Sequence, residues 1–205
     1  MSRPAVARPA PAARAATDKR LYDAAVRLFA QRGYHGTTLR EIVGAVGVHP
    51  AAFYYHFRSK DQLLREIMQR ALEDLTADVS AALAAEATAA ERLAAALRAH
   101  IVFHATRPLE AFVADSELRS LAEPDRRNIV KLRDRYERIF CAILEQGAAD
   151  GSFRVHDVKV ETYALMALAT AVAGWYRPRG RLSVDAVAEI YASLVLDGVR
   201  ARDSA

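Results

Sequence analysis

The stretch from Gly47 to Phe57, GVHPAAFYYHF, holds an unusual set of side chains that can donate hydrogen bonds and stack. Two adjacent tyrosines and a histidine carry polar tips, and phosphate oxygens accept hydrogen bonds from such groups. Ala51 and Ala52 are small enough to let a helix approach base edges or thymine methyl groups closely. These residue types predict contact with a nucleic acid.

The charge of the chain supports this interpretation because it is divided unevenly. Residues 1–60 hold ten Lys or Arg and three Asp or Glu, a formal charge of +7. Residues 61–205 hold 19 basic and 22 acidic residues, a formal charge of −3. A basic segment favours a polyanionic partner, here for the N-terminal third only. A basic tail that only aids solubility is the alternative.

Short helices must position these residues. Helical periodicity and capping signals indicate a first helix from Thr17 to Gly33 and a second from Thr37-Thr38 to Gly47. A third helix is expected from Pro50 to His56, since proline suits the first helical position. Two short helices joined by a tight turn after a longer one form a helix-turn-helix unit, whose second helix lies in the DNA major groove.

The phase of the third helix separates its residues by role. Val48, Phe53 and Phe57 face a small core, which leaves the polar and small residues outside. Hydroxyls and free backbone N–H groups at helix starts also favour phosphate. The candidate DNA-contacting residues are Thr37, Thr38, Arg40, His49, Pro50, Ala51, Ala52, Tyr54, Tyr55, His56 and Lys60.

Residues 17–64 resemble the DNA-binding domain of the TetR family of bacterial transcriptional regulators. The resemblance is carried by AAVRLFAQRGYHGTTLREIVGAVGVHPAAFYYHFRSKDQLL. It implies phosphate contact by Thr38, Tyr54, His56 and Lys60, and base-facing positions for His49 to Ala52 and Tyr55. His49 and Pro50 stand where the family often has Ser or Thr followed by a polar residue. We therefore expect a missing N-cap there, and base readout through the imidazole.

The remainder of the chain also reads as helix, so the predicted fold class is all-α. Further helices are expected at about 91–105, 108–121, 124–149, 157–176 and 183–201, with either a helix end or a weak joint in the Ala-rich stretch 77–90. The predicted divisions are a disordered basic arm (1–16), a helix-turn-helix DNA-binding domain (17–64) and an effector-binding and dimerisation domain (65–205). The arm either follows a phosphate backbone or is an inert tail.

The last two predicted helices, 157–176 and 183–201, are expected to form a homodimer. The run from Tyr163 to Gly174 is apolar nearly all round, so it must be covered on several sides. One short recognition helix reaches few base pairs, and two half-sites on a palindromic operator would supply affinity. A core formed within one chain is the alternative.

A small-molecule effector is the second expected partner. ELRSL at 117–121, LRDRYERIF at 132–140 and the C-terminal segment 175–199 are similar to actinobacterial TetR-type regulators, some of which respond to acyl-CoA thioesters. That similarity implies an acyl-CoA as one candidate effector, although these motifs also read as a salt-bridged surface and a helix-ending packing motif. The candidate effector-binding residues are His100, Phe103, His104, Phe112, Arg133, Tyr136, Phe140, Trp175 and Arg177.

The sequence also holds residues that could serve two other kinds of site. His100 and His104 have the i, i+4 spacing of metal ligands, and Asp115 and Glu117 are further candidate ligands. The favoured interpretation is that the two histidines are a polar pair in an apolar pocket. Neither a metal nor a cofactor is expected. Cys141 is the only cysteine, and we expect it to pack inertly.

The sequence therefore predicts a ligand-responsive repressor rather than an enzyme, because no nucleophile–base pattern or Gly-rich phosphate loop is present. A DNA-binding or architectural protein without an effector is the alternative, and an all-α enzyme is a more distant one. No apolar run is long enough to span a membrane and no hydrophobic signal core is present, so we expect a cytoplasmic protein.

Overall fold

A computed structural model describes residues 11–200, and these residues form an all-α fold, which confirms the predicted class. Beyond helices, the described range contains an isolated antiparallel bridge between Phe153 and Arg200. None of its helices has the length and apolarity needed to cross a bilayer. The helices are α1 (Pro11–Arg32), α2 (Leu39–Val46), α3 (Pro50–Phe53), α4 (Lys60–Leu83), α5 (Ala89–Thr106), α6 (Pro108–Ser116), the 3₁₀ helix η1 (Glu117–Ser120), α7 (Asp125–Ala149), α8 (Val158–Thr170), α9 (Val172–Trp175) and α10 (Val184–Val199).

Helix α1 begins at Pro11 rather than at Thr17. Proline is pre-organised for the first helical position, and the alanines that follow it have the highest helix propensity. Residues 11–16 are therefore helical, which corrects the predicted boundary of the arm. Residues 1–10 of that arm lie outside the described residues.

The helix-turn-helix forms at the predicted capping residues. Thr38 caps α2, and Gly47 ends it in the left-handed conformation at φ 72°, where glycine has no Cβ penalty. Helix α3 ends at Phe53 instead of His56, and residues 54–56 form a turn. The rings of Phe53 and Phe57 both enter the core, 5.5 Å apart between centroids, so the chain tightens after Phe53.

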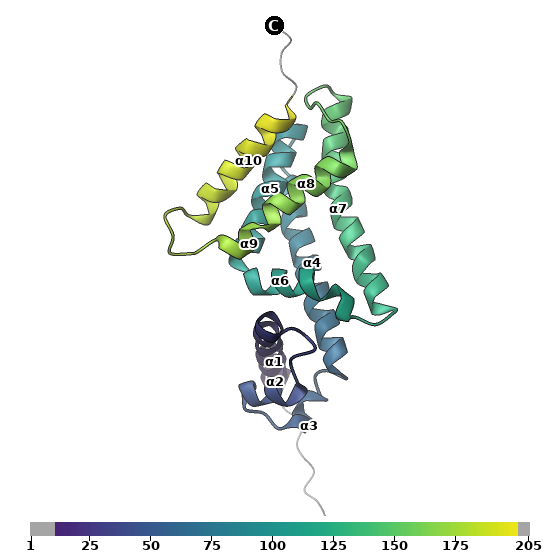
Figure 1. The fold of residues 1–205 in the computed structure, drawn as a ribbon, viewed down its shortest axis with the longest axis vertical. Coiled ribbons are helices and arrows are strands. Elements are labelled where there is room, and N and C mark those ends of the chain that lie inside the picture. Colours follow the sequence, from purple (N-terminus) through teal and green to yellow (C-terminus); the bar gives the residue numbers. More distant parts are fainter. Residues whose placement is uncertain (1–10, 201–205) are drawn as a thin grey trace, which may run out of the picture.

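Two apolar cores hold the molecule together. The N-terminal core joins α1, α2 and α3 to the first half of α4, with Phe29, Phe53 and Phe57 almost fully buried. Val113 of α6 and Leu121 after η1 also pack into it. The N-terminal helices are therefore seated on α6 and η1, and in Figure 1 they occupy one end of an elongated molecule.

The second core is built around α5, which contacts α4, α7, α8 and α10. Helix α4 ends at Leu83 and α5 begins at Ala89, so the predicted helix end within 77–90 is confirmed. Thr88 and Glu91 form a capping box that starts α5. Helix α4 therefore runs from the N-terminal core into the second core (Figure 1), and it is shared by both.

Candidate nucleic-acid interface and effector pocket

His49 begins α3 and supplies its N-cap. Its Nδ1 accepts a hydrogen bond from the Ala51 backbone N–H at 3.2 Å, which is the role that Ser, Thr, Asp or Asn usually fills. The expected absence of a cap is therefore wrong. Because Nδ1 accepts here, the ring proton of a neutral His49 lies on Nε2.

The outward face of the recognition segment, residues 49–55, is accessible. The side chains of Tyr54 and Tyr55 are exposed, by 60% and 63%, although both are large aromatic residues. His49, Pro50 and Ala51 are exposed as well, and Ala52 is half-buried. The division between buried Phe53 and Phe57 and outward tyrosines follows the predicted phase. A surface with small residues beside two phenol groups can approach bases and donate to phosphates.

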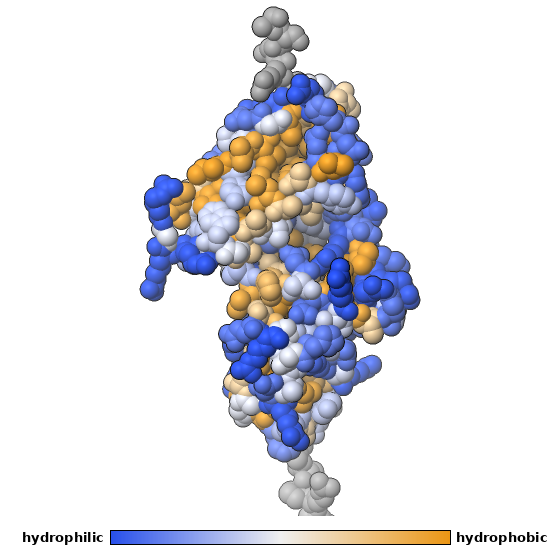
Figure 2. All heavy atoms as spheres, viewed as in Figure 1, coloured by the Kyte–Doolittle hydropathy of each residue, from blue (hydrophilic) through white to orange (hydrophobic). Residues whose placement is uncertain are grey.

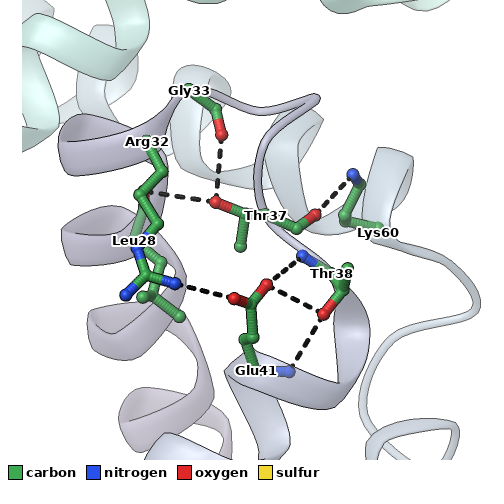
Figure 3. A network of polar contacts seen from close by, with 7 residues as sticks. All are labelled: Leu28, Arg32, Gly33, Thr37, Thr38, Glu41 and Lys60. Atoms are coloured by element: carbon green, nitrogen blue, oxygen red, sulfur yellow. Dashed lines mark hydrogen bonds and ion pairs between the residues drawn. The ribbon is translucent and has the colours of Figure 1, made fainter.

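Thr37 and Thr38 have different roles, as Figure 3 shows. Thr37 is buried, and its hydroxyl lies within hydrogen-bond distance of the carbonyls of Gly33 (3.0 Å) and Leu28 (3.2 Å). It cannot reach a phosphate, so its predicted role as a DNA contact is wrong. Thr38 is exposed and forms a capping box with Glu41. Hydrogen bonds from Thr38 hold the pKa of the Glu41 carboxyl below its ordinary value.

Lys60 is used inside the protein. Its ammonium donates to the carbonyl oxygens of Tyr34 (2.9 Å) and Thr37 (2.8 Å) and lies 4.0 Å from the centre of the Tyr34 ring. The contact with Thr37 is visible in Figure 3. Lys60 therefore braces the turn between α1 and α2 instead of extending as a free cation toward phosphate. Arg40, on α2, is exposed.

His56 also points inward. Its Nδ1 lies 2.5 Å from Asp18 Oδ1, and its side chain is only 5% exposed. This pair ties the end of the recognition segment to α1, which corrects the expectation that the imidazole faces a groove. A neighbouring anchor, Arg20, donates to the Val46 carbonyl at the end of α2.

Sequence reasoning missed Asp18 and Arg20. The only available signal was that Asp18 is one of three acids among the first 60 residues, which are otherwise basic.

A cavity of about 240 Å³ lies in the larger helical part of the chain. Its walls come from α4, α5, α6, α7 and α8. The lining residues are Leu72, Leu75, His100, His104, Asp115, Arg133, Tyr136, Glu137, Tyr163, Met166 and Thr170. Four of the nine predicted effector residues are among them: His100, His104, Arg133 and Tyr136.

The other five predicted effector residues lie elsewhere. Phe103 and Phe140 are buried in the second core, because the apolar phase of their helices points into it. Phe112 is 51% exposed on α6. Trp175 and Arg177 line a separate hollow of about 250 Å³ between α9 and α10. None of these five lines the α4–α8 cavity.

The two cavity histidines form a hydrogen-bonded stack. His100 Nδ1 lies 2.7 Å from the Tyr136 hydroxyl, and His100 Nε2 lies 3.0 Å from the Thr170 hydroxyl. The His104 ring stacks on the His100 ring with centroids 4.1 Å apart, and its Nδ1 lies 2.8 Å from the His100 carbonyl oxygen. Burial lowers the pKa of both imidazoles, so both are neutral near pH 7.

The charged groups of the cavity are paired. Arg133 donates to the Ala114 carbonyl and lies 3.7 Å from the Asp115 carboxylate, and Glu137 forms an ion pair with Lys159. Glu117 is not part of the cavity, since it accepts a hydrogen bond from the Tyr34 backbone N–H at 3.1 Å. Within residues 11–200, no group of three or more His, Cys, Asp or Glu side chains has the arrangement of a metal site.

An apolar surface covers α8 and α10, and Figure 2 shows it on the same face as Figure 1. We call it the α8–α10 face. Its large exposed side chains are Val160, Tyr163, Leu168, Ile190 and Leu194, with exposures from 39% to 62%. A hollow of about 420 Å³ lies between the two helices. Contiguous apolar surface of this kind marks an interaction site.

Comparison with known proteins gives a consistent result. Residues 21–67 match the family described as bacterial regulatory proteins, tetR family, and residues 86–199 match the tetracyclin repressor-like C-terminal domain. The chain is 33% identical over 185 residues to the HTH-type transcriptional repressor KstR2 of Rhodococcus jostii, which covers 87% of this chain and 89% of that protein.

Solved structures agree. A bacterial regulatory protein in the tetR family from Rhodococcus RHA1 superimposes with a TM-score of 0.84 at 30% identity, over 91% of this chain and 98% of that one. The structure of AibR in complex with isovaleryl coenzyme A and operator DNA gives a TM-score of 0.77 at 26% identity, over 86% of this chain and 96% of that one.

The buried histidines make the free energy of unfolding depend on pH. Because the pKa of His104 is lower in the folded than in the unfolded chain, the unfolded state binds the extra proton below about pH 6.5, and the free energy of unfolding falls as pH falls. His104→Leu removes this titrating group. Between pH 7 and pH 5 the free energy of unfolding of the variant therefore falls less steeply than that of the wild type, by up to about 1.4 kcal/mol per pH unit.

Chemical denaturation at several pH values and one protein concentration measures this difference. Ile101→Ala, at a buried position of the same helix that does not titrate, is the control and keeps the wild-type slope. A His104→Leu slope equal to that of the wild type contradicts the prediction.

Proposed function

The chain belongs to the TetR family of bacterial regulatory proteins, and we propose that it is a homodimeric transcriptional repressor that a small hydrophobic effector releases from a palindromic operator. The observation that carries the proposal is the recognition segment: two exposed tyrosines beside small residues, on a short helix held by a buried core. Rings that are exposed by 60% and 63% are available to a partner.

The anchoring of the recognition segment supports contact with DNA. Binding to an operator requires that the segment keep its orientation while phosphates are contacted, since phosphate contacts position the protein and base contacts specify the sequence. Asp18, Arg20 and Lys60 form hydrogen bonds within the protein that hold this orientation. Tyr54 and Arg40 are left to meet phosphates, and His49 to Ala51 and Tyr55 are left to meet base edges. The N–H and hydroxyl of Thr38 both donate to Glu41 instead.

The α8–α10 face supports self-association. A helix-turn-helix dimer reads two half-sites about 34–36 Å apart, and a symmetric dimer buries the same face on both chains. The face is apolar and offers Ile190 and Leu194, exposed by 54% and 59%, to an identical copy. We therefore place the two-fold axis at α8 and α10, within the predicted interface of 157–176 and 183–201.

The cavity supports an effector. It lies among helices that also carry the N-terminal core, because α4 and α6 contribute to both. A ligand that favours one arrangement of these helices lowers operator affinity by its differential binding to the two states. An acyl-CoA is a candidate because AibR was crystallised with isovaleryl coenzyme A and operator DNA.

The recognition segment is tested by two substitutions with different expected patterns. Tyr54→Phe removes one phosphate donor, so affinity for all duplexes falls by about tenfold while the slope against salt is unchanged. His49→Asn keeps an N-cap acceptor for α3 but replaces the imidazole that faces the bases, so the ranking of operator sequences changes.

Fluorescence anisotropy on a palindromic duplex, selected by the wild-type protein from random DNA, and on unrelated duplexes measures both effects. Tyr176→Phe, which loses a hydroxyl far from α3, is the control and binds as the wild type does. Equal losses for Tyr54→Phe and His49→Asn on every duplex contradict these roles, and equal wild-type affinity for all duplexes contradicts the repressor proposal.

The α8–α10 face is tested by Leu194→Glu. A charge at the centre of an apolar interface must be desolvated without a partner, so the dimer dissociates. Analytical ultracentrifugation gives a mass near 22.5 kDa for the variant, against twice that for the wild type. Val130→Glu, at an exposed apolar position on α7, stays dimeric. A dimeric Leu194→Glu, or a monomeric wild type, rejects this interface.

A further inference from the structure

His104 has an unused hydrogen-bonding atom in the cavity. The residue is 3% exposed and lines the cavity wall, and its only hydrogen bond within residues 11–200 runs from Nδ1 to the His100 carbonyl. A carbonyl oxygen can only accept, so the ring proton lies on Nδ1. Nε2 then carries a lone pair, and burial, which lowers the His104 pKa, keeps it unprotonated. An acceptor in a cavity wall that meets no protein donor is available to a ligand or to water.

A free donor stands in the same cavity. Tyr136, His100 and Thr170 form a chain of two hydrogen bonds, and the three neutral groups together hold three polar hydrogens. Two of these hydrogens make the chain, so one hydroxyl hydrogen is left over. Tyr136 is 2% exposed and meets no other acceptor in the described range, so it donates to His100 Nδ1. His100 Nε2 then donates to Thr170, and the Thr170 hydrogen is the one left for a ligand.

The cavity has no unpaired cation to attract an anion. Arg133 Nη2 donates to the Ala114 carbonyl and lies 3.7 Å from the Asp115 carboxylate, so the positive charge of the guanidinium already has an anion beside it. The lining residues also include Glu137, which is paired with Lys159. A carboxylate or phosphate placed here would meet two acidic side chains and neutral imidazoles. Burying an unpaired charge in such surroundings is unfavourable.

The volume and the apolar wall of the cavity limit the size and shape of the ligand. Leu72, Leu75 and Met166 supply an apolar wall. The volume of about 240 Å³ exceeds the roughly 150 Å³ that accommodates benzene and is below the roughly 300 Å³ at which drug-sized pockets begin. A compact skeleton of one ring or a short chain fits, and a complete coenzyme A does not.

We propose that this cavity recognises an uncharged hydroxyl group on a compact apolar skeleton, with the ligand hydroxyl donating to His104 Nε2 and accepting from the Thr170 hydroxyl. The inference rests on the proposed function in treating the cavity as the effector site. The same chemistry can come from a free alcohol or from the hydroxyacyl group of a CoA thioester, whose phosphates then lie outside. Anionic head groups are disfavoured inside the cavity, because its charged groups are already paired and two of them are carboxylates.

The test uses the full-length protein without DNA and three probes that share one ring: cyclohexanol, cyclohexanecarboxylate and cyclohexylammonium. Isothermal titration is expected to give a dissociation constant for cyclohexanol at least tenfold below that of either ion. A second arm compares 3-hydroxybutyryl-CoA, butyryl-CoA and free CoA. If 3-hydroxybutyryl-CoA binds more tightly than butyryl-CoA, the hydroxyl group comes from a CoA thioester. If only cyclohexanol shows higher affinity because of its hydroxyl, the ligand is a free alcohol.

Substitutions locate the binding groups. Thr170→Val keeps the shape and removes the donor, and His104→Phe keeps a ring and removes the acceptor; each is expected to weaken cyclohexanol binding about tenfold. Thr170→Ser retains the hydroxyl and the affinity. Thr106→Val, at an exposed threonine on α5 outside the cavity, is the matched control.

The proposal is overturned if cyclohexanol does not bind, if either ion binds as tightly, or if both Thr170→Val and His104→Phe bind cyclohexanol normally. These outcomes are separate from failure of the proposed function. A protein that binds cyclohexanol through Thr170 and His104 but never binds a specific operator keeps the cavity chemistry and loses the repressor role.

Discussion

The backbone of Tyr34 is held from two sides, and the placement of the whole helix-turn-helix depends on this joint. Lys60, at the start of α4, donates to the carbonyls of Tyr34 and Thr37, while Glu117 of η1 accepts from the Tyr34 N–H at 3.1 Å. The turn between α1 and α2 is thereby fixed to α4 and to η1 at once. Helix α2 follows this turn and α3 follows α2, so the turn sets the orientation of the exposed tyrosines. Two of the three ammonium hydrogens of Lys60 are used to hold this joint.

The sequence predicts local structure well because helix ends are encoded locally. Thr38 and Gly47 cap or end α2 within a few residues of themselves, and both are predicted correctly. Pairs that meet across the fold were not predictable. His56 with Asp18 and Lys60 with Tyr34 are separated by 38 and 26 positions, and residue type does not reveal a distant partner. The sequence therefore predicts that both side chains are free for phosphate, whereas in the fold each has a partner within the protein.

The cavity shows the same limit. A helical phase places His100 and His104 on one face, and this was sufficient to predict that they lie together. The phase of one helix does not tell which face of a neighbouring helix it meets. Phe103 and Phe140 are therefore predicted to line the cavity but lie in the core. Thr170 and Asp115 line the cavity but are not among the expected effector residues. Helix α4, about 36 Å long, links this cavity to the joint, because Lys60 stands at its start and Leu72 lines the cavity.

We propose that ligand in the cavity and DNA at the recognition segment favour different arrangements of one structure. Coupling of this kind is reciprocal: each ligand must lower the affinity for the other by the same factor. The most direct measurement is operator affinity by fluorescence anisotropy with and without saturating cyclohexanol, together with cyclohexanol affinity by titration with and without operator. We expect both to fall by one common factor of at least about fivefold. An operator affinity that does not change when the cavity is saturated contradicts this coupling.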